Sequence, residues 1–411
     1  MKNRSALTLI FLTVFIDLLG FGILIPILPT FAVAKLHVSE TAVGVAIAVY
    51  SLVQFVFNPL FGKISDKNGR KPIILVCLLL NALGYVIFAF SNTYLMLIIS
   101  RIIGGIGGSS IGVAQAYIAD ITTKENRSKG MGMIGAAFGL GFVFGPLIGG
   151  LLSKFGYMVT GFGSAGFSTL AFLFTAFMLP ESLLNKDTAR MTAKKILDIK
   201  AMKSVFRKPD LSLLVILFFI LTFTTASIYA IVPLLGFQVY GFSNLQNGYI
   251  FGIVGFVGAL VQGGLIRVIS KSMSDLKLVT IGSILMMAGF ALLPYGGHFL
   301  GLALIAVVLA LGIGILQPIL LSLVSKVTSD EEQGITLGIN QSLSAFARVL
   351  GPLFGGFTFE FLGYTFPFLS SAAFTLIIVV LSLALLPKKV HIHNEIEEYE
   401  LNAKEEETSF N

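Results

Sequence analysis

The stretch Gly139–Gly150 reads GLGFVFGPLIGG, and a shorter copy, VLGPLFGG, stands at Val349–Gly356. Both copies lie in hydrophobic segments long enough to cross a bilayer. They share one register, because Gly145 and Gly351 are 351 − 145 = 206 positions apart. The same shift aligns Thr122 with Thr328, Glu125 with Glu331, Gly132 with Gly338 and Phe155 with Phe361. Two homologous halves in one orientation are a repeat plan of secondary transporters.

The composition is that of a chain immersed in lipid. Of 411 residues, 55% are apolar and 12% are charged, and the mean hydropathy is +0.91, whereas a soluble domain has roughly 25% charged residues. The first apolar segment, from Ala6 to Leu28, has no small-residue cleavage pattern, so it is interpreted as a span and not as a signal peptide. Cys77 is the one cysteine, which excludes an internal disulfide and a cysteine-ligated metal site.

Hydropathy predicts an all-α membrane protein with twelve transmembrane helices, each about twenty residues long. The predicted spans begin near Ala6, Ala42, Ile73, Tyr94, Gly130, Met158, Leu211, Leu245, Leu278, Phe299, Gly334 and Gly363. They form two pseudo-symmetric six-helix bundles, at residues 1–179 and 211–386. A basic linker, 180–210, separates the bundles, and an acidic tail, 387–411, follows them. We interpret the linker as a solvated segment, with docking on anionic lipid as the alternative.

The positive charge marks one face of the membrane. The chain has a net charge of +7, but only Lys35 and Lys154 fall in the predicted outer loops, and Arg101 and Arg348 fall within spans. The other 28 − 4 = 24 basic residues lie on the same side as both termini. The positive-inside rule therefore predicts cytoplasmic termini in a bacterial cytoplasmic membrane, with lipid rather than nucleic acid as the partner of the basic residues.

Asp17 is the one carboxylate predicted to lie deep within a span. It lies about eleven residues into the first span, so ~16 Å from the inner surface at 1.5 Å per residue. A charged carboxylate there costs ~2.5 to 3.5 kcal/mol or more and should be buried, paired or protonated. We predict that Asp17 carries the transported proton. The alternative is an aspartate whose hydrogen bonds brace spans 1 and 4.

Four motifs carry a resemblance to a known family. They are DLLGFGILIPILP from Asp17, GKISDKNGRKP from Gly62 to Pro72, LIISRIIGGIGG in span 4 and GLGFVFGPLIGG in span 5. In order and position they resemble the signature motifs of twelve-span drug:proton antiporters of the major facilitator superfamily, and tetracycline-type and multidrug efflux proteins above all. The resemblance implies two bundles around a central cavity, with spans 1 and 4 facing it.

Arg101 has a depth similar to that of Asp17, ~18 Å from the inner surface. If the two spans share a cavity, as the resemblance implies, Arg101 is the expected partner of Asp17, in direct contact or through water. The alternative is a static bridge from Arg101 to backbone carbonyls of the glycine-rich span.

The resemblance also implies a conformational latch in the Gly62–Pro72 loop. Gly62 opens the motif, Gly69 is expected to make a tight turn, and Asp66 is expected to pair with Arg70 beside Lys71, against the amino end of span 11. The second-half counterpart from Gly264 has Val268 in place of the acid and Lys271 in place of the glycine, so that latch is predicted to be degraded.

The antiporter motif is predicted to form a hinge or a tight seal. Its residues are Gly141, Gly145, Pro146, Gly149 and Gly150, with Gly351 and Pro352 in the second half. Proline removes a backbone donor and can bend a helix, and small residues let helices pack closely in lipid.

The second half has no deep carboxylate, and Thr222, Thr224 and Gln317 stand where relatives carry coupling acids. Coupling would then depend on Asp17 alone. Either few protons are exchanged per substrate, or transport is not coupled to protons. The predicted cavity is lined by Phe21, Gln54, Gln115, Tyr229, Gln317, Gln341 and Arg348. Aromatic walls with a few polar groups suit an amphipathic small molecule of any charge.

The sequence therefore predicts an exporter of drug-like amphipathic molecules in exchange for protons, working as a monomer with the proton gradient as its energy source and without a cofactor. An exporter or flippase of a lipid-like or sugar-like substrate is the alternative, and a non-transporting sensor or scaffold is the alternative from another class. An enzyme is not expected, because the four histidines fall in loops or the tail and no nucleophile or metal-ligand cluster appears.

Overall fold

The computed structural model describes residues 2–183, 205–329 and 332–384, and these ranges are helical and contain no strand. The first half contains α1 (Lys2–Leu36), α2 (Glu40–Asn68), α3 (Arg70–Ala89), α4 (Tyr94–Gly107), α5 (Ser110–Ile121), α6 (Lys124–Leu152), the 3₁₀ turn η1 (Ser153–Phe155) and α7 (Tyr157–Met178). The second half contains α9 (Pro209–Leu234), the π-helical segment η2 (Leu235–Val239), α10 (Asn244–Leu260), the π-helical segment η3 (Val261–Leu265), α11 (Ile266–Ser272), α12 (Asp275–Leu292), the 3₁₀ turn η4 (Leu293–Tyr295), α13 (Phe299–Lys326), α14 (Gln333–Leu362) and α15 (Phe366–Ala384). The centre of the predicted linker and the predicted acidic tail lie outside these ranges.

Twelve helical segments of the described chain are long and apolar enough to span a bilayer, which confirms the predicted span number. They run from 19 to 32 residues, and most are longer than the ~20 that a ~30 Å hydrocarbon core requires. The helices therefore extend beyond the hydrocarbon at one or both ends, or cross it at a tilt.

One predicted span is interrupted. Span 4 consists of α4 and α5, and the break lies at Gly108–Ser109. Gly107 packs so closely on α3 that an added Cβ would lie 2.6 Å from the backbone nitrogen of Asn81. The break changes the helix direction at mid-depth and brings Ser110 toward the first helix.

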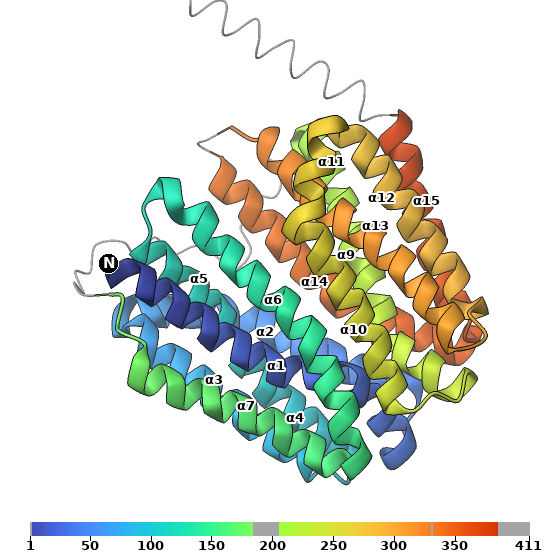
Figure 1. The fold of residues 1–411 in the computed structure, drawn as a ribbon, viewed down its shortest axis with the longest axis horizontal. Coiled ribbons are helices and arrows are strands. Elements are labelled where there is room, and N and C mark those ends of the chain that lie inside the picture. The colour runs from blue at the N-terminus through green and yellow to red at the C-terminus, as the bar shows by residue number, and fades with distance from the viewer. Residues whose placement is uncertain (1, 184–204, 330–331, 385–411) are drawn as a thin grey trace, which may run out of the picture.

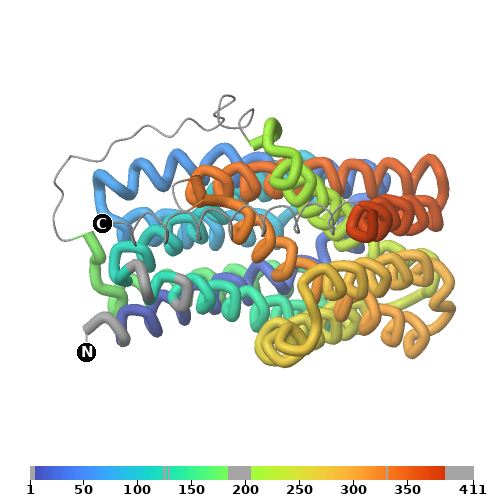
Figure 2. Tube along the Cα trace, turned by 90° about the horizontal axis from the view of Figure 1, so that it is seen from above, coloured from blue at the N-terminus to red at the C-terminus, as the bar shows by residue number. Residues whose placement is uncertain are grey.

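The two halves repeat one packing arrangement (Figure 1). In the first half α6 packs against α1, and in the second half α14 packs against α9. The helices α6 and α14 also contact the other bundle, because α6 packs on α10 and α14 packs on α2. Viewed after a quarter turn, the helices of both bundles run nearly parallel to one another (Figure 2).

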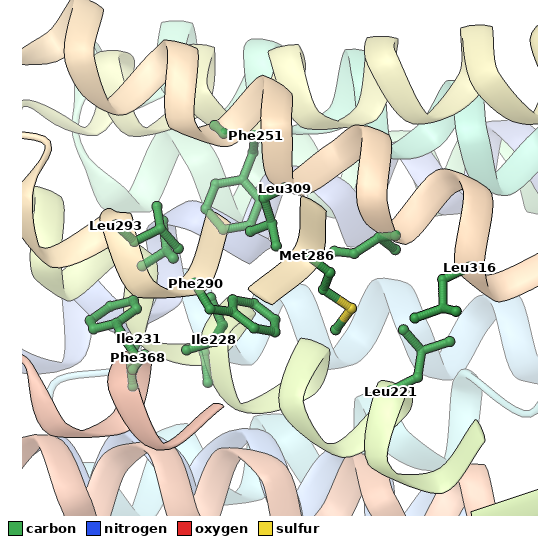
Figure 3. Packing of buried hydrophobic residues seen from close by; sticks show 14 of the residues in the cluster. Leu221, Ile228, Ile231, Phe251, Met286, Phe290, Leu293, Leu309, Leu316 and Phe368 are labelled. Carbon is green, nitrogen blue, oxygen red and sulfur yellow. The ribbon is translucent and has the colours of Figure 1, made fainter. Parts of the chain in front are cut away.

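The interior of the second bundle is filled by aliphatic and aromatic side chains (Figure 3). Phe251, Met286, Phe290 and Phe368 come from three helices, α10, α12 and α15, and are nearly fully buried. Without a hydrophobic drive between helices in lipid, such van der Waals contacts are a main source of bundle stability.

Candidate functional site

Asp17 lies in α1 with its side chain buried, and it is surrounded by hydrogen-bond donors from three other helices. Asn81 Nδ2 in α3 donates to both carboxylate oxygens, at 3.1 Å from Oδ1 and 3.0 Å from Oδ2. Ser168 Oγ in α7 lies 2.7 Å from Oδ1, and Ser110 Oγ in α5 lies 3.2 Å from Oδ2. All three partners are neutral, so the carboxylate is bound without a fixed cation.

Asp17 was predicted from the sequence, but its three partners were not. Asn81 is an amide in the middle of an apolar helix, and a buried amide requires partners, so its type and depth were the available signal. Ser110 and Ser168 gave no such signal, because serine is common in transmembrane helices and often bonds only to its own backbone.

Arg101 forms no ion pair with Asp17 or with any other carboxylate of the described residues. Its Nε lies 3.2 Å from the neighbouring Ser100 Oγ, its guanidinium lies 5.7 Å from the centroid of the Phe88 ring, and its Nη2 is buried without a hydrogen-bond partner. Tyr50 and Tyr85 lie within electrostatic range of both Asp17 and Arg101. Direct contact, one of the two predicted arrangements, is therefore absent from this conformation.

The predicted cavity residues fall into two groups. The aromatic group is packed: Phe21 lies 5.5 Å from Tyr50 and 6.3 Å from Phe142 between ring centroids, and Tyr229 lies 5.7 Å from Phe251. In the polar group, Gln54 donates to the Gly108 carbonyl at 2.8 Å. Gln115, Gln317 and Gln341 are exposed.

Arg348 is half-buried and has no hydrogen-bond or ion-pair partner in the described chain. It stands one helical turn before Pro352 in α14, on the face that packs on α2. Thr222 and Thr224 bond to carbonyls of their own helix, four residues back, so they supply no obvious substitute for a coupling acid.

The bundles are closed against each other at one end, which we call the opposite end and define by the turns His37–Ser39 and Tyr240–Ser243. A Cβ on Gly255 of α10 would lie 2.7 Å from the Phe142 carbonyl oxygen of α6, and one on Gly356 of α14 would lie 3.2 Å from the Gly44 Cα of α2. Gln238 Nε2 donates to Glu40 Oε1 at 2.7 Å across the same boundary. These contacts leave no room for a side chain between the backbones.

The bundles separate toward the other end, which we call the basic end and define by the turns at Gly69 and Met273–Ser274. Along α6, a Cβ on Gly139 would lie 3.8 Å from Ala259, and Gly135 and Gly132, farther along, have no atom within 4 Å. Gly334 and Gly338 of α14 are equally open. Figure 1 shows α6 and α10 diverging in this direction.

The antiporter motif and its copy pack closely, mostly against helices of their own bundle. Both helices continue through Pro146 and Pro352. A Cβ on Gly145 would lie 2.6 Å from Gly22 Cα, and one on Gly351 would lie 2.8 Å from Ser227 N. The same close fit is found at Gly141, Gly149 and Gly150, which approach Leu18, Ile23 and Leu245. Leu245 belongs to the other bundle, whereas the other contacts named here lie within one bundle. Between the bundles, a Cβ on Gly248 of α10 would lie 2.5 Å from the Pro146 carbonyl oxygen. The role of the motif as a hinge or a seal stays a prediction.

The predicted latch is an ion-pair network within the first bundle. Arg70 Nη1 lies 2.6 Å from Asp66 Oδ1 and its Nε lies 2.9 Å from Asp120 Oδ2. Gly69 has a positive φ of 104°, as the predicted tight turn requires. Asp66 is half-exposed, and no hydrogen bond or ion pair of the described residues joins it to α14. The contact with span 11 that the resemblance implies is therefore absent while the basic end is open.

Glu181, just after α7, completes this network and was missed. Its Oε1 accepts from the Arg70 backbone N–H at 2.9 Å and its Oε2 accepts from that of Lys71 at 3.1 Å. A carboxylate is stabilising at the amino end of a helix. Lys71 Nζ donates to the Ala176 carbonyl at 2.8 Å, while Gly62 has no neighbour within 4 Å of an added Cβ.

The second half has an ion pair at the matching position with its charges exchanged. Lys326 Nζ lies 2.6 Å from Asp275 Oδ2. Lys326 is the repeat counterpart of Asp120, since 326 − 120 = 206, and Asp275 begins α12 as Arg70 begins α3. The degradation of the second-half latch stays a prediction: the acid and the glycine of the motif are absent, although an ion pair joins the matching helix ends.

Two bundles of membrane-spanning helices that meet at one end and part at the other define a membrane transporter, and not an enzyme. The Major Facilitator Superfamily model matches residues 10–348 and 268–405, and the chain belongs to this family. It is 30% identical over 388 residues to multidrug resistance protein 1 of Bacillus subtilis, covering 93% of this chain and 97% of the relative. It is 31% identical over 374 residues to the class H tetracycline resistance protein of Pasteurella multocida, covering 87% and 90%.

A solved structure of the human organic anion transporter MFSD10 (TETRAN) aligns with a TM-score of 0.67 at 27% identity. The alignment covers 93% of this chain and 100% of that one. The relatives support small molecules as the substrates.

Proposed function

We propose that this transporter exports amphipathic drug-like molecules in exchange for protons, with Asp17 as the proton site. The observation that carries the proposal is a buried carboxylate at mid-depth that is held by neutral groups alone. A fixed cation would lock it in the charged state, whereas neutral partners leave both protonation states accessible. The multidrug and tetracycline resistance relatives support the substrate class.

Alternating access supplies the transport step. The basic end is open in this conformation, and the positive-inside rule assigns it to the cytoplasm, so substrate would enter from there. Closing the basic end would bring Asp66 and Arg70 toward α14. At the opposite end, the contacts of Gly44 with Pro352 and of Gly248 with Pro146 would open. Arg101, without a carboxylate partner, is free to respond to the charge of Asp17 through Tyr50 and Tyr85.

One proton is enough to drive export. A proton that moves down ~200 mV of total driving force supplies ~4.6 kcal/mol, which corresponds to a substrate concentration ratio of roughly a thousand. A second coupling acid in α9 or α13 is therefore not required.

The test is uphill transport of ethidium, tetracycline and a panel of amphipathic dyes into everted vesicles with an imposed pH gradient, for wild type and Asp17→Asn. The variant should lose gradient-driven uptake but keep downhill exchange. Asp275→Asn, a matched change at a helix end near the surface, should retain uphill transport. Uphill, pH-dependent transport by Asp17→Asn would contradict the proton-site assignment. If the native substrate is lipid-like or sugar-like, no dye should be taken up, and that substrate should be transported instead.

A specific observation favours anionic amphipathic molecules as a second candidate substrate. Arg101 and Arg348 both lie within spans and neither has a carboxylate partner in the described chain. A half-buried cation at the edge of an opening between the bundles can bind an anion, and one relative is an organic anion transporter. Arg348→Gln should weaken uptake of anionic dyes at least tenfold and leave uptake of cationic dyes nearly unchanged. Equal loss for both classes would contradict an anion preference.

A further inference from the structure

The side chain of Asn81 makes a one-sided contact with Asp17. Its Nδ2 lies at nearly equal distances from the two carboxylate oxygens, 3.1 and 3.0 Å. Its Oδ1 is buried and accepts no hydrogen bond. The amide nitrogen is therefore hydrogen-bonded and the amide oxygen is not. An unsatisfied buried polar atom is costly and uncommon.

The unsatisfied oxygen matches what protonation of Asp17 would require. A carboxylate only accepts hydrogen bonds, but a carboxylic acid also carries an O–H donor and needs an acceptor. An arginine or lysine partner could not provide one. An amide can, because a half-turn about its Cβ–Cγ bond exchanges Nδ2 for Oδ1 at almost the same position.

The surroundings fit this exchange. The amide is packed on Gly107, where an added Cβ would collide with Asn81 Oδ1, so the glycine leaves space for an amide in either orientation. The two exchanging groups are similar in size, and the exchange needs no backbone movement. Since Nδ2 is equidistant from both oxygens, Oδ1 in its place could accept from whichever oxygen carries the proton.

The other groups near Asp17 are less suited to this role. Ser168 and Ser110 each reach one carboxylate oxygen. The titratable side chains within electrostatic range of Asp17 are Tyr50 in α2 and Cys77 and Tyr85 in α3, and the charged Arg101 in α4 lies within range of the two tyrosines. None of these forms a hydrogen bond with the carboxylate in the described chain.

We propose that Asn81 is the positioning residue of the proton site and that its side-chain amide turns over with the protonation of Asp17. It donates through Nδ2 to the carboxylate and accepts through Oδ1 from the carboxylic acid. This inference rests on the proposed function of Asp17 as the proton site. It assigns to Asn81 the stabilisation of both states between which the transporter cycles.

The test is infrared difference spectroscopy of the full chain in liposomes, titrated from alkaline to acid pH, with isotope-labelled asparagine. The carboxylic C=O band that appears in wild type and is lost in Asp17→Asn reports Asp17. The labelled amide C=O band that is lost in Asn81→Leu reports Asn81. On acidification the Asn81 band should move to lower wavenumber with the same midpoint as the Asp17 band, because Oδ1 gains a hydrogen bond.

Variants provide a second readout. Asn81→Leu is close in size but can neither donate nor accept. The hydrogen bond to the charged carboxylate is the stronger of the two that are lost, so the midpoint of the Asp17 band should rise by about one pH unit, a tenfold change in proton affinity. The band itself should move to higher wavenumber. Asn81→Thr, which can donate and accept, should restore part of both shifts. The wild-type label experiment needs no variant, so a misfolded variant does not prevent the test.

Failure of the proton-site assignment can be distinguished from failure of the amide turnover. If no carboxylic band is lost in Asp17→Asn, the proton-site assignment fails. If Asp17 titrates but the Asn81 band stays fixed, or if it still moves in Asp17→Asn, the amide turnover is overturned while the proposed function stands.

Discussion

Glu360 Oε2 accepts a hydrogen bond from the backbone N–H of Thr41 at 3.0 Å. The bond joins the end of α14 to the first turn of α2, across the boundary between the bundles at the opposite end. A carboxylate is favourable at the amino end of a helix, by ~0.3 to 1 kcal/mol when exposed. This contact must break when the opposite end opens, so it biases the transporter toward the conformation described above.

Replacing Glu360 should shift the transporter toward opening at the opposite end. Glu360→Ala removes both the acceptor and the charge, with an expected cost of about 1 kcal/mol to the closed form, or roughly a fivefold change in population. The measurement is the distance between spin labels at Lys154→Cys and Tyr295→Cys, two exposed positions of the opposite end, in a Cys77→Ser background. An unchanged distance distribution would show that Glu360 does not hold this end closed.

Enlarging Gly44 should prevent closure of the opposite end. A Cβ there would lie 3.1 Å from the Pro352 carbonyl carbon and closer still to its oxygen, so Gly44→Val should cost about 1 to 3 kcal/mol in the closed form. The same spin-label pair should report a longer distance, and uphill transport should fall at least tenfold. Gly166→Val is the matched control, because Gly166 has no atom within 4 Å of an added Cβ. Similar losses in both variants would indicate a general effect of valine and not a wedge between bundles.

The two ion pairs at the basic end should differ in strength. Arg70 is buried and has a network of partners, so Arg70→Ala should lower stability by about 3 kcal/mol, near the lower range for breaking a buried pair, and Arg70→Lys should recover only part of it. Lys326 is exposed, so a charge-exchange cycle of Asp275→Lys and Lys326→Asp should give a coupling of ~0.2 to 1 kcal/mol. Thermal unfolding of purified protein measures both, and equal values would contradict the asymmetry.

Some parts of the site could be predicted from residue type and depth. Asp17 was identifiable because an acid within an apolar helix is costly wherever the helix packs. The tight turn at Gly69 and the pair Asp66–Arg70 follow from local sequence, since the two charges are four residues apart. The role of Glu181 could not be predicted in the same way, because it contacts Arg70 across 111 positions of the chain.

Depth and sequence pattern did not predict the surroundings of Arg101 or the ion pair between Asp275 and Lys326. Arg101 and Asp17 share a depth, but the rotation of α4 directs the guanidinium toward Phe88 and the two tyrosines. The pattern from Gly264 lacks the acid and the glycine of the latch, yet Asp275 and Lys326 meet because α12 and α13 are neighbours. In both cases the packing of helices, and not the local motif, selects the partners.

The sequence by itself determined the number of spans, the twofold repeat, the depth of Asp17 and the basic character of one end, because hydropathy, helix rise and charge placement are local properties of the chain. Only the tertiary structure decided which groups bind Asp17 and that Arg101 is not one of them. It also decided that the bundles meet at the opposite end and part at the basic end. These depend on the rotation and tilt of each helix and on the break at Gly108. Such features are fixed by close contact between residues up to 319 positions apart, as in the bond between Thr41 and Glu360.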